Sequence, residues 1–233
     1  MCNIGNIAIS FARLLYDCDC EIGTLDVFFR FPLHRCAKYD ILKSTRMTED
    51  FYYGIYVLAN GFEEIEALCP LDLLRRAGVD VKTVAVGAES LTVTGSHGIT
   101  VLADMDEKDF SDGAPEMVIL PGGMPGATNL DNSEVVNGAI RAALACDAYL
   151  AAICAAPMIL GKRDVLQGKR AICFPGFEEY LHGATVAAER VVRDGKIITA
   201  AGMGVALDFG LALVAALRGK EAAIALRRTV LAD

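Results

Sequence analysis

The fold is decided by the stretch Tyr149-Leu150-Ala151-Ala152-Ile153-Cys154-Ala155-Ala156-Pro157. It begins as an apolar run, stops at a cysteine and continues as a helix-like pattern, which predicts a strand that turns abruptly into a helix. The small residues Ala152, Ala155 and Ala156 leave room for a strained backbone at that corner. We therefore expect Cys154 on a nucleophile elbow, where backbone N–H groups at the start of the helix favour the thiolate. A buried cysteine that only fills space is the alternative for this segment.

Strand-like and helix-like segments alternate along the chain from Tyr52 onward. We expect strands at residues 53–58, 79–86, 117–120, 148–153, 170–173, 186–192 and 196–199, and helices at residues 63–77, 135–146, 155–163 and 205–217. A hairpin-like section is expected around residues 95–102. This order predicts an α/β fold with a doubly wound, mostly parallel sheet and helices on both faces, whose ligand site lies at the carboxyl ends of the strands. The buried face of the first helix is expected to consist of Ile65, Leu68, Leu71 and Leu74.

The composition places limits on the function. The chain has 233 residues, of which 54% are hydrophobic, and a mean hydropathy of +0.39, which fits a sheet covered on both faces. No run reaches the roughly 18 apolar residues of a membrane span, so we expect a soluble protein without a membrane partner. The net charge of −8 and the pI near 5.0 argue against a nucleic-acid partner, since phosphate binding needs a basic stripe.

The cysteines do not form a recognisable disulfide framework. Half of them lie in the first forty residues, as Cys2, Cys18, Cys20 and Cys36. A zinc site that combines Cys18, Cys20 and Cys36 with His34 is an alternative, but its spacing fits none of the usual ligand pairs. We therefore expect no metal, free thiols and a reducing, cytoplasmic location.

Residues 1–50 differ in character from the rest of the chain. They mix isolated apolar pairs with charges and cysteines, and they show neither strand alternation nor a lasting helical stripe. We expect an N-terminal extension here, poorly ordered or non-native, and an α/β domain over residues 51–233. Met47 precedes the first strand by a few residues, as a native start would, which suggests the hypothesis that the upstream stretch comes from a misplaced start codon.

The loop after the first expected strand carries three carboxylates. For Glu63 and Glu64, compensation of the helix dipole is the favoured explanation. Glu66 lies near the apolar face of the helix, and a half-buried glutamate has a raised pKa. It is therefore expected to keep its proton and to donate a hydrogen bond to a nearby thiolate.

A second loop at the same edge reads Pro121-Gly122-Gly123-Met124-Pro125-Gly126. Its glycines allow main-chain N–H groups to approach a ligand, although a plain tight turn is the alternative. Together with the N–H of Ala155, the N–H of Gly123 would form an oxyanion hole facing Cys154. The loop has neither the P-loop pattern nor G-x-G-x-x-G, so it is not a phosphate-binding loop and no cofactor is expected.

Four segments resemble the motifs of a known superfamily. They are Gly61-Phe62-Glu63-Glu64-Ile65-Glu66, Leu120-Pro121-Gly122-Gly123, Ala151-Ala152-Ile153-Cys154-Ala155-Ala156-Pro157 and Asp208-Phe209-Gly210-Leu211-Ala212. In this order, from about residue 52 to the end, they are similar to the ThiJ/PfpI superfamily, in the branch of the parkinsonism-associated deglycase. The resemblance implies a flavodoxin-like α/β sandwich, a homodimer, Cys154 as the reactive cysteine and Glu66 as its protonated partner. It implies nothing for residues 1–50.

The sequence departs from the pattern of this superfamily at two positions. Where the protease-like branch has a histidine after the cysteine, this chain has Ala155, which disfavours peptidase activity. Where the deglycase branch often has a histidine before a proline, this chain has Phe174 before Pro175. These two residues and Gly122 are expected to line the site, but Phe174 supplies no proton shuttle.

Two histidines and a further cysteine carry weaker signals. His182 lies in a turn-like Leu-His-Gly context and His97 lies between a serine and a glycine, so neither is assigned as the base. Cys173 is interpreted as the end of a buried strand, with a second thiol near the site as the alternative.

These features predict a cysteine-dependent enzyme of the glyoxalase III or deglycase type. Its substrates would be small α-oxoaldehydes such as methylglyoxal and glyoxal, or their early glycation adducts, to which the Cys154 thiolate adds. The alternative is a redox-responsive stress protein or holdase chaperone in which the same cysteine is oxidised. A glutamine-amidotransferase-type hydrolase would need a His-x-Glu pair after the cysteine, and the chain has none.

Overall fold

The computed structural model of the chain describes residues 53–110 and 115–232. The chain divides into two units, Met1–Pro32 and Leu33–Asp233, and every described residue belongs to the second. Several predictions lie outside the described residues: the extension at residues 1–50, the hypothesis about Met47, and the alternative zinc site of Cys18, Cys20, Cys36 and His34. The domain boundary at residue 51 therefore stays a prediction.

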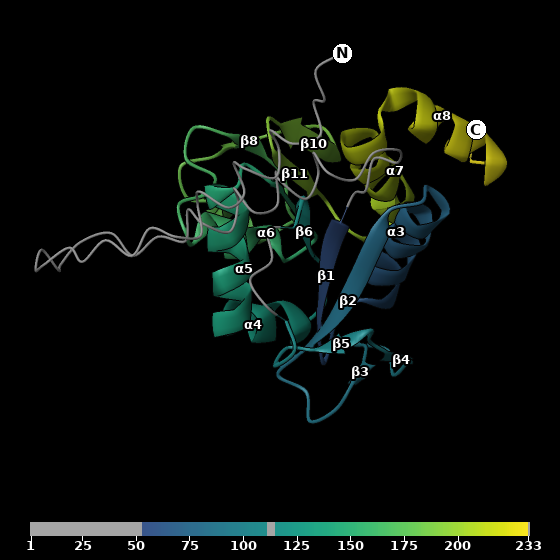
Figure 1. The fold of residues 1–233 in the computed structure, drawn as a ribbon. Coiled ribbons are helices and arrows are strands. Elements are labelled where there is room, and N and C mark those ends of the chain that lie inside the picture. Colours follow the sequence, from purple (N-terminus) through teal and green to yellow (C-terminus); the bar gives the residue numbers. More distant parts are fainter. Residues whose placement is uncertain (1–52, 111–114, 233) are drawn as a thin grey trace, which may run out of the picture. The chain divides into compact units, whose positions relative to one another are not determined.

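A seven-stranded sheet forms the centre of the described part (Figure 1). In order across the sheet, its strands are β10 (Val191–Asp194), β11 (Ile197–Ala200), β7 (Tyr149–Ile153), β6 (Met117–Leu120), β1 (Tyr53–Ala59), β2 (Asp80–Val86) and β5 (Met105–Asp106). Every neighbouring pair is parallel except β10 with β11. The predicted doubly wound, mostly parallel α/β sheet is confirmed.

Two small sheets accompany the large one. β3 (Thr92–Thr94) pairs antiparallel with β4 (Thr100–Leu102), which confirms the predicted hairpin, and β8 (Arg170–Ala171) pairs parallel with β9 (Thr185–Val186). The single strand expected at residues 186–192 is wrong. The chain changes partners there, because β9 pairs with β8 whereas β10 pairs with β11.

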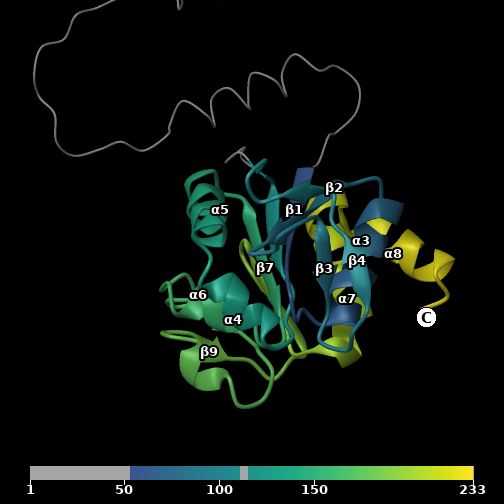
Figure 2. The ribbon, with the colours of Figure 1, turned by 90° about the horizontal axis from the view of Figure 1, so that it is seen from below.

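Helices cover both faces of the large sheet (Figure 2). One face carries α3 (Glu64–Arg76), α7 (Ala206–Arg218) and α8 (Lys220–Thr229), and the other carries α4 (Gly126–Asp131), α5 (Glu134–Ala145) and α6 (Pro157–Gly161). Two short 3-10 helices are η1 (Glu178–Tyr180) and η2 (Met203–Val205). Side chains of the central strands alternate between the two buried clusters, which explains why β1, β6 and β7 read as continuous apolar runs.

The helices differ from the predictions in three respects. Neither α4 nor α8 was expected: α4 has only six residues, and α8 buries only Ala223 and Leu226, so its apolar stripe is narrow. The expected helix at residues 155–163 is shorter, since α6 spans Pro157–Gly161. The buried face of α3 is also different, because Ile65 is 48% exposed whereas Glu64 and Glu66 are buried.

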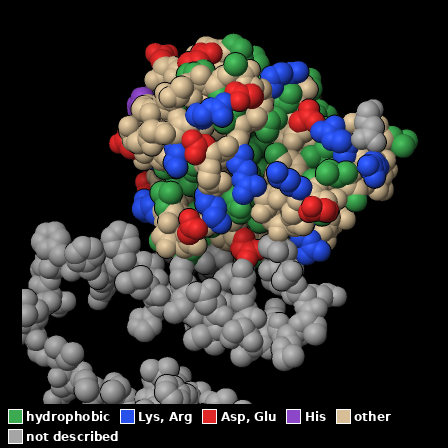
Figure 3. Space-filling model, turned by 90° about the horizontal axis from the view of Figure 1, so that it is seen from above, with side chains coloured by type: hydrophobic (Ala, Val, Ile, Leu, Met, Phe, Trp, Pro, Cys, Tyr) green, Lys and Arg blue, Asp and Glu red, His purple; other side chains and the backbone are tan. Residues whose placement is uncertain are grey.

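The described surface mixes charges of both signs. On the face drawn in Figure 3, Lys and Arg side chains stand among Asp and Glu side chains instead of forming one basic stripe. Surface ion pairs include Lys169 with Asp194 and Arg76 with Asp72. None of the helices in residues 53–110 and 115–232 combines the length and the apolar character that crossing a bilayer requires.

Candidate active site

Cys154 lies where the chain leaves the sheet. β7 ends at Ile153 and α6 begins at Pro157, so Cys154 occupies the corner between strand and helix. Its φ is 64°, in the left-handed region that a non-glycine residue rarely adopts. Its N–H donates to the carbonyl of Ala200 (2.9 Å) and its carbonyl accepts from the N–H of Phe174 (2.8 Å), which anchors the corner on both sides. The predicted sharp turn is present.

Glu66 reaches the same edge of the sheet from the first turn of α3. Glu63 caps this helix, because its Oε2 accepts a hydrogen bond from the N–H of Glu66 at 2.6 Å. The buried hydroxyl of Tyr56, on β1, donates to the carbonyl of Glu66, also at 2.6 Å. The Glu66 side chain is 1% exposed. The cap and the tyrosine therefore hold the start of the helix, and with it the carboxyl, in one place.

Gly122 brings the two side chains together. A Cβ on Gly122 would lie 2.4 Å from Oε2 of Glu66 and 2.6 Å from Cβ of Cys154, so both side chains pack against the face that glycine leaves open. The next residue, Gly123, has a φ of 89°, and a Cβ there would lie 2.3 Å from the Glu63 nitrogen. The loop after β6 therefore needs glycine at both positions to contact the elbow and the start of α3 together.

The Glu66 carboxyl keeps its proton up to about neutral pH. Burial raises its pKa to about 7, and the charge of Glu63 acts in the same direction. The hydrogen bond with Cys154 and the N–H groups of Gly122 and Met203 lower the pKa, but not enough to cancel the effect of burial. Oε2 of Glu66 is buried without a hydrogen-bond partner of normal geometry among the described residues, a position where a charge is costly.

The position of Cys154 at the elbow does not by itself ionise the thiol. Burial raises the pKa of Cys154, and a charge on Glu66 raises it further, to about 12, whereas the N–H groups of Ala155 and Gly123 lower it. The N–H groups at the elbow favour the thiolate, as expected, but burial and the charge of Glu66 outweigh their effect. A charged Glu66 carboxylate repels a thiolate on Cys154. The thiolate is therefore favoured only when Glu66 is protonated, because that repulsion is then absent.

Of the other predicted site residues, Phe174 contacts the reactive pair and Pro175 does not. Phe174 lies against the site: besides its backbone contact with Cys154, its ring comes within 3.2 Å of the point where a Cβ on Gly202 would lie. Pro175 follows it and is exposed, and no described contact joins Pro175 to Cys154 or Glu66. The loop that contains His182 is exposed as well.

The remaining described cysteines lie apart from this chemistry. Cys173 is 1% exposed and burial raises its pKa to about 11, which supports its interpretation as the end of a buried strand. Cys69 and Cys173 are free thiols, as is Cys154. Cys146 is disulfide-bonded, so the expectation of free thiols is wrong at that position.

Sequence reasoning missed Gly202 and Met203. A Cβ on Gly202 would lie 3.8 Å from Oε1 of Glu66, and the N–H of Met203 lowers the pKa of the Glu66 carboxyl. The signal that points to them is their place in the chain, because they follow β11, which is parallel to β7 and ends at the same edge of the sheet.

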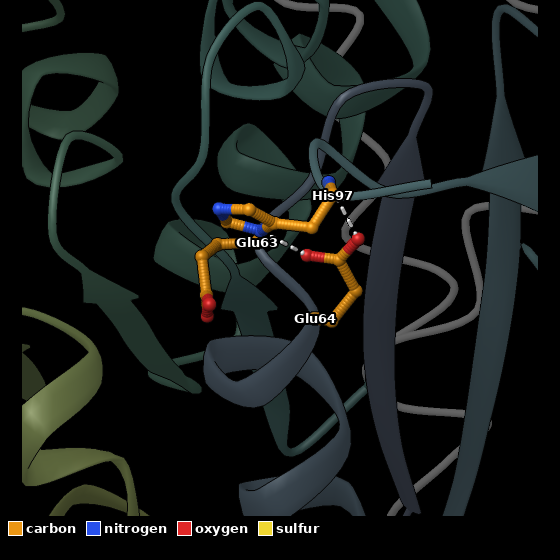
Figure 4. Close-up of side chains that lie close together, drawn as sticks. All are labelled: Glu63, Glu64 and His97. Atoms are coloured by element: carbon orange, nitrogen blue, oxygen red, sulfur yellow. Dashed lines mark hydrogen bonds and ion pairs between the residues drawn. The ribbon is translucent and has the colours of Figure 1, made fainter. Parts of the chain in front are cut away.

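Glu63, Glu64 and His97 are the group of described residues whose side chains could together hold a metal ion, with ligand atoms within 4.8 Å of one another. The contacts of Glu64 favour a structural role instead (Figure 4). Its Oε1 accepts from the N–H of His97 (2.7 Å) and of Ile99 (3.4 Å), and its Oε2 contacts Nδ1 of His97 (2.8 Å). The carboxylate therefore ties the loop between β3 and β4 to the first turn of α3.

These contacts also set the charges of the Glu64–His97 pair. Burial raises the pKa of Glu64, but the hydrogen bonds from His97 and Ile99 outweigh burial and lower the pKa to about 2. The hydrogen bond with Glu64 in turn raises the pKa of His97. Because the Nδ1 of His97 is engaged with Glu64, the structure gives no reason to assign His97 as a catalytic base.

Comparisons with known proteins agree on one family. The sequence profile of the DJ-1/PfpI family matches residues 55–216. Protein DJ-1 homolog B of Arabidopsis thaliana is 39% identical over 169 residues, which are 72% of this chain and 38% of that protein. Among solved structures, oxidized DJ-1 of Toxoplasma gondii is 31% identical, with a TM-score of 0.74 over 77% of this chain and 98% of that one.

A more distant relative has a named activity. The glutathione-independent glyoxalase DJR-1.2 of Caenorhabditis elegans is 28% identical over 161 residues, which are 68% of this chain and 84% of that protein. The chain spans less than half of the length of the two Arabidopsis relatives, 38% and 43%. The family profile, the sequence identities and the shared fold confirm the resemblance inferred from the motifs: the chain belongs to the DJ-1/PfpI family.

Proposed function

We propose that the chain is a cysteine-dependent, glyoxalase III-like or deglycase-like enzyme that acts on small α-oxoaldehydes. The observation that carries the proposal is the meeting of the Glu66 carboxyl and the Cys154 side chain against Gly122. A nucleophile beside a proton carrier is what addition to an aldehyde and a following proton transfer require. The glyoxalase of Caenorhabditis elegans in the same family supports this reaction type.

The first step forms a bond between the Cys154 sulfur and the aldehyde carbon of methylglyoxal. The π electron pair of the aldehyde moves onto its oxygen, which the N–H groups of Gly123 and Ala155 stabilise, and the oxygen then takes up the proton of Glu66. The product is a hemithioacetal, and Glu66 is left as a carboxylate. An early glycation adduct enters the same sequence once its amine or thiol leaves and frees the aldehyde.

The next steps move hydrogen between the two carbons of the adduct. The Glu66 carboxylate removes the proton from the carbon bound to sulfur, which gives an enediolate, and the hydroxyl proton on that carbon passes to the former ketone oxygen. As the C=O bond next to sulfur forms, Glu66 returns its proton to the former ketone carbon, which gives the thioester of lactate and leaves Glu66 as a carboxylate. One carbon is oxidised as its neighbour is reduced, so no external oxidant is needed. Water then attacks the thioester carbon and gives one proton to the Glu66 carboxylate, and the C–S bond breaks with its electron pair on sulfur. Lactate leaves, and the second proton of the water goes to solvent.

The test is lactate formation from methylglyoxal by the purified full chain. Cys154→Ala is expected to abolish Cys-dependent turnover, and Glu66→Gln to lower the rate by about 10²- to 10⁴-fold, the usual contribution of a general acid or base. Cys69→Ala removes another partly exposed free thiol and is the matched control, expected to keep the parent rate. A parent that forms no more lactate than Cys154→Ala would contradict the proposal.

A second candidate function uses oxidation of the same sulfur. The N–H groups of Gly123 and Ala155 and the protonated Glu66 carboxyl surround Cys154 with hydrogen-bond donors, which would stabilise the oxygens of a sulfinate. The Toxoplasma gondii relative has been solved in an oxidized form. Redox sensing or a holdase activity is favoured over catalysis if peroxide adds two oxygens to Cys154 alone while no lactate forms above background.

A homodimer belongs to the proposal, formed through exposed apolar side chains of α3 and of the hairpin β3–β4. Ile65 on this helix is 48% exposed, and Ile99 and Leu102 near the hairpin are 52% and 75% exposed. The double change Ile65→Glu and Leu102→Glu is expected to convert the dimer to a monomer in sedimentation velocity. Ile224→Glu on α8, where the side chain is 52% exposed, is the control and is expected to remain dimeric. A monomeric parent would contradict this part.

A cytoplasmic location is a further part of the proposal. Three of the four described cysteines are free thiols, and the mechanism needs Cys154 reduced. Fractionation of cells that express the full chain tests the location, and recovery of the chain in a secreted fraction would contradict it.

A further inference from the structure

Two large apolar side chains border the reactive pair and remain open to solvent. Phe174 is 47% exposed, and Met203 is 53% exposed. Exposed apolar area next to a reactive group gains free energy when a ligand covers it. Phe174 and Met203, called the border below, therefore influence which substrates bind next to the sulfur.

The backbone N–H groups of Phe174 and Met203 contact the two residues that react. The N–H of Phe174 donates to the carbonyl of Cys154 at 2.8 Å, and the N–H of Met203 interacts with the carboxyl of Glu66. Gly202 lies between the two: a Cβ on it would be 3.2 Å from Cδ2 of Phe174 and 3.8 Å from Oε1 of Glu66. The aromatic ring of Phe174 and the carboxyl of Glu66 therefore both lie beside Gly202, which has no side chain to stand between them.

A cation lies beside the next glycine along the chain. Nη2 of Arg190 comes within 3.1 Å of the point where a Cβ on Gly204 would lie, two residues beyond Gly202. Phe174 and Met203, the two exposed residues whose backbones contact the pair, are themselves apolar.

We propose that Phe174 and Met203 form a subsite for the substituent of the substrate, so that the preferred substrates are α-oxoaldehydes that carry an aryl or a branched alkyl group. This inference rests on the proposed function and names its substrate class. The methyl group of methylglyoxal is too small to cover the exposed ring and thioether, whereas a phenyl group removes apolar area from water on both surfaces. Met203 also adapts its shape and makes favourable contacts between sulfur and an aromatic ring.

The test compares kcat/KM for phenylglyoxal and methylglyoxal with the full chain, by measuring mandelate and lactate. Phe174→Ala and Met203→Ala are each expected to lower the value for phenylglyoxal about tenfold and that for methylglyoxal only about twofold, because the small methyl group loses little contact. Phe174→His introduces a polar ring of similar size and is expected to shift the preference toward methylglyoxal. Ile224→Ser, a similarly exposed apolar residue on α8, is the matched control for surface hydrophobicity and is expected to change neither value.

Two further measurements make the outcomes decisive. Cys154→Ala serves as the blank for adducts that phenylglyoxal forms with arginine, and sedimentation velocity reports the oligomeric state of each variant. If Phe174→Ala, Met203→Ala and Phe174→His all keep the parent's ratio of kcat/KM for phenylglyoxal to that for methylglyoxal, the subsite is overturned. Continued Cys154-dependent turnover of methylglyoxal in that case leaves the proposed function intact. Loss of the dimer in Phe174→Ala with an unchanged preference shows that a second copy of the chain occupies this surface, and this also overturns the subsite. A parent without Cys154-dependent product from either aldehyde overturns both proposals.

Discussion

A Cβ on Gly122 would stand 2.4 Å from Oε2 of Glu66, so the residue at position 122 controls how closely the carboxyl approaches the elbow. The contact is possible because the loop after β6 passes between the start of α3 and the end of β7. The chemistry of the site thus depends on a residue that has no side chain. This relationship leads to the first of four predictions.

Gly122→Ala is expected to lower the rate of lactate formation by at least about a hundredfold, because the new methyl group forces Glu66 and Cys154 apart and a displacement of about 1 Å has this effect. The overpacked site is also expected to lower the free energy of unfolding by about 1–3 kcal/mol. Gly54→Ala on β1 is the control, since a Cβ there meets only ordinary contacts at 3.5 Å or more. Equal activity of Gly122→Ala and Gly54→Ala would show that the contact does not position the pair.

The pH dependence of Cys154 alkylation identifies the group that loses the first proton of the pair. If the thiol loses the first proton and Glu66 keeps its own, the iodoacetamide reactivity of Cys154 is expected to rise at a lower pH than that of the other thiols, because the repelling charge on Glu66 is then absent. Cys69 and Cys173 in the same protein are the internal comparison, because burial raises the pKa of both thiols. Reactivity of Cys154 that stays low until far above pH 9 would mean that the proton lost near pH 7 comes from Glu66.

The free energy of unfolding is expected to fall as the pH rises past the pKa of Glu66. Burial raises the pKa of this carboxyl from 4.5 to about 7, so its favourable contribution is fully present below about pH 4.5 and is lost as the pH rises through about 7. At pH 8, Glu66→Gln is expected to unfold in urea with a free energy about 3 kcal/mol above that of the parent, and this gain is expected to vanish near pH 4. Glu179→Gln, at an exposed position, is the control. A gain that is the same at both pH values would rule out this linkage.

Removal of the Glu64 carboxylate is expected to loosen the loop between β3 and β4. In Glu64→Ala, the N–H groups of His97 and Ile99 lose their acceptor, so both amides are expected to exchange faster with deuterium than in the parent. In the parent, the lowered pKa of Glu64 means that its contribution is present above about pH 4.5 and is lost as the pH falls through about 2. Glu221→Gln on α8 is the control. Unchanged exchange at His97 and Ile99 would exclude the anchoring role.

The strands and the elbow were predictable from the sequence because local patterns determine them. The runs that became β1, β6 and β7 are apolar on both faces, as a covered parallel strand requires, and the alanines around Cys154 leave room for a tight turn. The helix α8 escaped prediction for the same reason, since two buried residues make too weak a stripe.

The buried face of α3 and the protonation of the site were decided by the tertiary structure. Periodicity placed Ile65 inside, but the loops that reach the first turn of α3 supply hydrogen-bond donors and glycines, so Glu64 and Glu66 are buried there instead. The pKa of Cys154 likewise depends on burial and on a carboxyl from a segment about ninety residues away, which no local rule for a helix terminus contains.

The sequence by itself determined the alternation of the main strands and helices, the sharp turn at Cys154 and the family, since each depends on residues that are neighbours along the chain. Only the tertiary structure decided that Glu66 and Cys154 meet against Gly122 and that the ring of Phe174 lies beside Gly202. Those relationships arise where parallel strands end side by side, and the distances between side chains from different loops are set by packing across the sheet.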